Sequence, residues 1–163
     1  MFNINGGIRK SFKRVGKIKK NNKMQTNKIL LGGLAGTVTI LVLSWLTYGI
    51  LLKDFVAANF NQSAVRPMDD QVIWAMILSY LSIGFLLAII FSWTNTKGII
   101  AGAKVGGIIG LLMAVYCDTT WHFLSTMFLN TSAVFIDIII NTVLATIGGG
   151  VIGLVMGLGK KEV

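Results

Sequence analysis

Four long apolar runs, separated by short polar segments, dominate the hydropathy pattern of the chain. They cover residues 29–52, 72–93, 99–118 and 133–158. Each has about the 20 residues that a helix needs to cross the hydrocarbon layer of a membrane, and none alternates polar and apolar positions as a barrel strand does. Because backbone polar groups in lipid must be hydrogen-bonded internally, the pattern predicts an all-α integral membrane bundle of four transmembrane helices.

The polar segments divide the chain into a basic N-terminal tail, a membrane domain and a short C-terminal tail. Residues 1–28 form the tail, 29–159 the four-helix domain and 160–163 a second tail. In the first tail, apolar residues recur at helical spacing, which favours an amphipathic helix on the inner leaflet; they are Ile8, Phe12, Val15 and Ile18. A second interpretation is that the residues before Met24 are an upstream extension, since the chain from there already resembles a membrane-protein N-terminus.

The composition is too apolar for a soluble domain of this size. Hydrophobic residues make up 54% of the chain and charged residues 13%, against roughly 25% charged in soluble domains. The formal charge of +9 is concentrated, because nine of the fifteen basic residues precede the first apolar run. A basic tail beside a membrane span binds anionic lipid headgroups, and no nucleic-acid recognition pattern accompanies it. The expected partners are therefore the lipid bilayer and its anionic headgroups, with no nucleic acid.

The positions of the charges predict an orientation. With the N-terminus inside, thirteen basic residues fall on the cytoplasmic side, namely the nine of the tail with Lys97, Lys104, Lys160 and Lys161, and only Lys53 and Arg66 fall outside. Basic residues accumulate in cytoplasmic loops. We therefore expect a multi-pass protein of the cytoplasmic (inner) membrane with both termini in the cytoplasm. Five of the six acidic residues then lie toward the outer side.

Glycine recurs every four residues in three of the runs. Apolar helices gain little from association in lipid, so small residues that allow close backbone approach are what bring them together. The rows predict tight helix packing, within the bundle or against a second copy; a pore lining or a sliding path is the alternative. They are Gly102, Gly106 and Gly110 in the third run with Gly98 directly before it, Gly149, Gly153 and Gly157 in the fourth, and Gly32 with Gly36 in the first.

Polar residues near the predicted outer surface form a candidate site. Asp118 and His122 are four residues apart, as are Asp137 and Asn141, so on helices each pair shares a face. The two pairs could hold a cation or a proton between the third and fourth helices. The alternative is that they are boundary residues. The third span then ends at Asp118, which reaches headgroups and water, and residues 119–132 form an interfacial helix or a loop.

No pattern of an enzyme, metal centre or cofactor site accompanies these residues. One histidine with a few carboxylates is a poor zinc or copper ligand set. The single cysteine, Cys117, excludes an intrachain disulfide. No serine elbow, phosphate-binding loop or Cys-x-x-Cys pair is found in the sequence. We therefore expect a protein that is not an enzyme and that binds no metal or cofactor.

A family resemblance rests on three segments, "SWLTYGILLKDFVAANF", "GAKVGGIIGLLMAVYCD" and "FIDIIINTVLATIGGGVIGLVMG". They resemble a group of small uncharacterised bacterial four-helix inner-membrane proteins. The matching residues are Trp45, Tyr48, Gly49, Phe55 and Asp137, and the resemblance covers most of residues 29–158. It implies the same four-helix topology and supplies no activity.

Two functions are compatible with these features. The first is a non-enzymatic membrane protein that acts through glycine-mediated packing, as a homo-oligomer or as an accessory subunit of a membrane complex. The second is a small transporter or channel for protons, cations or a small solute, with an acidic site on the outer side.

Overall fold

The computed structural model describes residues 4–158 as an all-α chain, with side chains described for residues 25–67 and 69–158. Four of its helical segments are long and apolar enough to cross a membrane, as the hydropathy pattern predicts. The main helices are α1 (Ile4–Leu46), α2 (Lys53–Asn59), α3 (Ile73–Trp93), α4 (Ile99–Leu124) and α5 (Thr131–Gly157). A π-helical stretch, Thr47–Leu51, extends α1, and two short 3-10 turns, Gln62–Ala64 and Met68–Asp70, precede α3.

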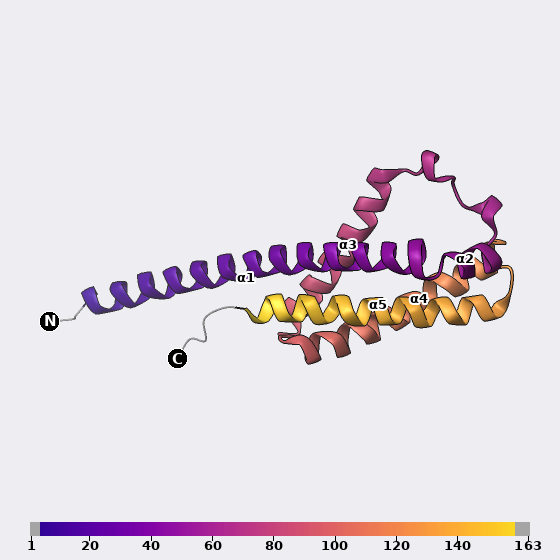
Figure 1. Ribbon diagram of the computed structural model, residues 1–163. Coiled ribbons are helices and arrows are strands. Elements are labelled where there is room, and N and C mark those ends of the chain that lie inside the picture. Colours follow the sequence, from indigo (N-terminus) through magenta and orange to yellow (C-terminus); the bar gives the residue numbers. More distant parts are fainter. Residues whose placement is uncertain (1–3, 159–163) are drawn as a thin grey trace.

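The spanning helices form an antiparallel bundle in which α4 and α5 are the most closely associated pair. α1 packs against both α5 and α3, whereas α3 makes little contact with α5 and almost none with α4. Figure 1 shows α3 crossing α1 at an angle, and the N-terminal part of α1 projecting beyond the end of the bundle where α5 finishes. We call the opposite end, which holds α2 and the α4–α5 connection, the loop end.

Two boundaries differ from those that the sequence pattern predicts. α4 continues six residues past Asp118, through Leu124, so Asp118 lies inside the helix rather than at its end. The added residues include Trp121, Phe123 and Leu124, which are exposed and apolar, as on a lipid-facing surface. α1 begins at Ile4, so its backbone helix runs through residues 4–28 into the first span. The amphipathic side chains expected at residues 8–18, and the tail at 160–163, lie outside what the structure describes.

The glycine rows of α4 and α5 face each other and set the distance between the two helices. A Cβ added at Gly149 would lie 2.5 Å from the Gly102 carbonyl oxygen and 2.8 Å from the Gly106 Cα. The Gly98 amide donates a 2.8 Å hydrogen bond to the Gly153 carbonyl, and Gly98 has φ +89°, which favours glycine. Backbone thus packs directly on backbone along this pair, as small-residue rows allow.

The other glycines of the rows also contact helices of the same chain. Gly110 faces Ala145 of α5, and Gly157 lies beside Gly98 and Lys97. Gly32 and Gly36 of α1 receive the side chains of Met156 and Ile152. Ile152 and Met156 belong to a buried core cluster with Ile40, Leu87, Ala88 and Phe91. The rows are therefore occupied within a single chain.

The loop end is closed by an aromatic contact between two segments far apart in the sequence. Phe60, after α2, and Phe128, between α4 and α5, have ring centroids 4.9 Å apart. The Asn61 amide donates to the Met127 carbonyl at 2.9 Å, and the Leu129 amide to the Asn59 carbonyl at 3.0 Å. Both phenylalanines are buried, in a cluster that includes Ala114 of α4 and Ile138 of α5. This contact ties the connection between α4 and α5 to the segment that follows α2.

Replacing Asn130 with alanine is expected to lower the free energy of unfolding by about 1 kcal/mol, because Asn130 is the N-cap of α5. Its side-chain oxygen accepts from the Ala133 amide at 2.8 Å, and its amide donates to Asn59 at 2.9 Å. Unfolding in a detergent titration measures the change. Asn130→Asp, which keeps the capping oxygen, is the control; a loss as large as that of the alanine variant would argue against the capping role.

Candidate functional site

A hydrogen-bonded polar cluster lies near the loop end, between α5 and the π-helical stretch that extends α1. The Tyr48 hydroxyl donates to Oδ1 of Asp137 at 2.6 Å. One turn further along α5, Nδ2 of Asn141 donates to Oδ2 of Asp137 at 3.0 Å and to its carbonyl at 3.1 Å. The Asp137 side chain is buried. Both of its carboxyl oxygens therefore have donors inside the protein.

Asp118 of α4 faces the same cluster but is much less well paired. Only 7% of the residue is exposed. It lies close enough to Asp137 and Tyr48 for electrostatic interaction with both. Among the described side chains, its Oδ2 is the only buried nitrogen or oxygen atom that lacks a hydrogen-bond partner. Buried polar atoms of native proteins nearly always have a partner, so an exception calls for a ligand, a proton or a water.

The close packing of α4 and α5 explains why the two carboxyl groups meet. Asp118 precedes the end of α4 by six residues and Asp137 follows the start of α5 by six, which places each about 9 Å from its helix end. The connection between the helices is short, from Ser125 to Asn130. Small residues, Ala114 and Gly110 on α4 and Ala145 on α5, lie nearby and leave space between the helices.

That space is a cavity of about 370 Å³ between α1, α3, α4 and α5. Asp118, Asn141 and Tyr48 form its polar wall, together with Ser44, Tyr80 and Cys117. The remaining lining is apolar and comprises Ile40, Ile83, Gly110, Met113, Ala114, Leu144 and Ala145. Asp137 does not line the cavity and lies behind Tyr48 and Asn141, which hold its carboxyl oxygens.

No basic side chain balances these two acids within residues 25–67 and 69–158. The ion pair found there joins Arg66 and Asp70 at 3.1 Å, on the exposed loop before α3. Lys104, on the same helix as Asp118, is exposed and precedes it by fourteen residues, or about 21 Å along the axis. The cluster is therefore an acidic site without a cationic partner in the described part of the chain.

The structure brings together three of the four residues proposed from the sequence. Asp118, Asp137 and Asn141 lie together, and Asp118 and Asn141 line the cavity. His122 does not join them. It lies one turn beyond Asp118, where the same face of α4 is turned toward the α4–α5 connection. Its imidazole is exposed and lies edge-on to the Phe128 ring, with 6.4 Å between the ring centroids. The hypothesis that Asp118 reaches headgroups and water also disagrees with its burial, since α4 continues beyond it.

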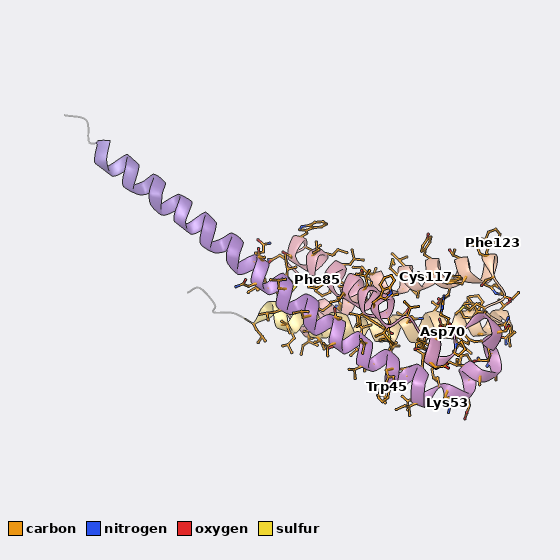
Figure 2. All side chains as sticks on the ribbon, turned by 90° about the horizontal axis from the view of Figure 1, so that it is seen from above. Trp45, Lys53, Asp70, Phe85, Cys117 and Phe123 are labelled. Atoms are coloured by element: carbon orange, nitrogen blue, oxygen red, sulfur yellow. The ribbon has the colours of Figure 1, made fainter. Side chains whose placement is uncertain are left out.

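Tyr48 is a site residue that the sequence pattern did not identify. It is one of the residues that carry the resemblance described above, and a tyrosine hydroxyl within an apolar span signals a polar partner, because buried hydroxyls usually have one. The other residues of that resemblance lie elsewhere: Trp45 and Gly49 are exposed, and Phe55 packs edge-on to Phe60. Figure 2 shows Trp45 and Phe123 pointing away from the bundle.

Comparisons with known proteins give no information on the role of this site. The resemblance to small bacterial inner-membrane proteins stays a prediction. No protein-family model, curated protein or solved structure matches the chain.

Proposed function

We propose that the protein is a small membrane transporter that binds a proton or a cation at Asp118, beside Asp137. The observation that supports this most directly is the buried, unpartnered Oδ2 of Asp118 next to a second carboxyl group and a cavity. Ionisable residues within membrane spans are costly and are most often part of an ion or proton pathway.

Electrostatics favours an occupied site over an empty one. Two carboxylates close together in a low-dielectric interior repel each other, and burial also disfavours the charged form. A bound proton or cation relieves both penalties. Tyr48 and Asn141 already donate hydrogen bonds to both carboxyl oxygens of Asp137. The oxygen that is free to bind a proton or a cation is therefore Oδ2 of Asp118.

Glycine-mediated association with a second copy, the other function predicted from the sequence, is less well supported by this geometry. The close contacts of Gly102, Gly106, Gly149 and Gly153 are made between α4 and α5 of one chain. The rows therefore serve as an intramolecular scaffold that holds Asp118 and Asp137 near each other. The proposal places the protein in the cytoplasmic membrane with the loop end outside, since basic residues concentrate at the other end.

Flux measurements in proteoliposomes test the proposal. Vesicles loaded with a pH dye are expected to show proton influx above empty vesicles, or isotope uptake for sodium or potassium. Asp118→Asn is expected to reduce that flux by about tenfold or more, because an amide cannot exchange a proton and a charged hydrogen bond to a bound cation contributes roughly 1.5–3 kcal/mol.

Asp54→Asn is the matched control, since Asp54 is exposed on α2 and outside the cavity. This variant should transport as the unmodified protein does. If protons, sodium and potassium all fail to move faster than through empty vesicles, the proposed transport of these ions is contradicted.

A further inference from the structure

The cavity beside Asp118 has the size and lining of a binding site for a small organic molecule. Its volume of about 370 Å³ falls within the roughly 300–1,000 Å³ of small-molecule pockets, which are mostly apolar with a few placed polar groups. Side chains of Ile40, Ile83, Met113 and Leu144 supply most of the apolar wall. Apolar surface of this kind stabilises a ligand that has an apolar body.

The same lining favours an organic cation over an inorganic one. Calcium takes six to eight oxygen ligands and magnesium a near-ideal octahedron. Asp118 is the one carboxylate of the lining, and the described residues contain no group of three or more histidine, cysteine or acidic side chains that could hold a metal. A sodium or potassium ion that entered the cavity would lose hydrating water and find mostly hydrocarbon side chains in its place.

The polar wall fits a positive charge of low charge density. Asp118 offers an unpartnered buried carboxyl oxygen. Two tyrosines also line the cavity, Tyr48 from the π-helical extension of α1 and Tyr80 from α3. Aromatic faces attract organic cations, most strongly where water is excluded. A carboxylate with aromatic neighbours is the combination that recognises ammonium or similar groups.

We propose that the substrate is a monovalent organic cation with an apolar body, such as a protonated amine or a quaternary onium ion. Its charged group lies at Asp118 and its apolar part against Ile83, Met113 and Leu144. This inference rests on the proposed function, because it names the class of cation that Asp118 binds.

Binding of tritiated tetraphenylphosphonium to the purified protein in lipid nanodiscs tests this inference. We expect saturable binding that weakens by about tenfold or more in Asp118→Asn, and comparably in Ser44→Phe, which fills the cavity from α1. Asp54→Asn is expected to bind as the unmodified protein does. Circular dichroism and gel filtration show that each variant is folded.

Cys117 provides an internal reporter of where the probe binds. It is the only cysteine of the chain and lines the cavity. Bound tetraphenylphosphonium is expected to slow its alkylation by N-ethylmaleimide, and this protection should be lost in Asp118→Asn. Sodium or potassium at matched ionic strength should not protect it.

The outcomes separate this inference from the proposed function. Equal binding by the unmodified protein, Asp118→Asn and Ser44→Phe would indicate partition into lipid and overturn the inference. Absence of binding, with a proton or sodium flux that still depends on Asp118, would overturn the organic substrate and leave the proposed function standing. Absence of both would overturn both.

Discussion

Replacing Gly149 with alanine is expected to lower the free energy of unfolding by about 1–3 kcal/mol, the usual cost of overpacking a close contact. The added methyl group would lie 2.5 Å from the Gly102 carbonyl oxygen and 2.8 Å from the Gly106 Cα. Both are backbone atoms, so no side-chain rotation can make room. α4 and α5 must move apart, which disturbs the whole row of contacts.

Gly150→Ala is the matched control, because it adds the same methyl group to the neighbouring residue of the same helix. Its nearest contact would be the Ile99 side chain at 3.5 Å, an ordinary van der Waals distance. Alanine is the better helix former by about 0.5–1 kcal/mol, so this variant should be as stable as the original or more so. Denaturation in mixed micelles, followed by circular dichroism, compares the two. Equal stability of both variants would contradict the close α4–α5 packing.

Asp137→Leu is expected to lower the free energy of unfolding by about 1–3 kcal/mol, because it leaves buried donors without an acceptor. The Tyr48 hydroxyl loses its 2.6 Å hydrogen bond and the Asn141 amide its 3.0 Å bond to the carboxyl group. Asp137→Asn removes the same charge, and so relieves the same repulsion from Asp118, but retains an oxygen that can accept from Tyr48; its cost should therefore be smaller. The same denaturation experiment measures all three proteins.

A double-mutant cycle isolates the contribution of Tyr48. Hydrogen bonds between membrane helices average about 0.6 kcal/mol in such cycles. The Tyr48→Phe and Asp137→Leu changes should therefore be less than additive by about that amount. Strict additivity would mean that the hydrogen bond contributes nothing to the folded state. Tyr48→Phe alone should leave the apolar packing of the ring intact.

Much of the fold could be predicted from the sequence, and the reason is local. Each apolar run is long enough to span a bilayer, and a helix is the conformation that satisfies its backbone without help from neighbours. The spacing of Gly102, Gly106, Gly149 and Gly153 likewise identifies one face of each helix as a close-packing surface. The end of α4 was less predictable, because the residues after Asp118 are only partly apolar; the helix nevertheless continues through the exposed Trp121 and Phe123.

Only part of the candidate site could be predicted from the sequence. Spacing of four residues places Asp137 and Asn141 on one face of a single helix, and they do hydrogen-bond. The same spacing predicted that Asp118 and His122 act together, yet only Asp118 points into the bundle. The environment of each turn of α4 depends on its neighbours, which are α5 at Asp118 and the Phe60–Phe128 contact near His122. Tyr48 is 89 residues from Asp137 in the chain, so no local pattern relates the two.

The sequence by itself determined the secondary structure, the membrane character and the faces on which helices approach closely, since hydropathy and residue size act through local conformation and through lipid. Tertiary packing alone decided which polar groups meet. Backbone contact along the glycine rows fixes the separation and rotation of α4 and α5. These two quantities bring Asp118 toward Asp137 and Tyr48, leave its Oδ2 without a partner and open the cavity beside it.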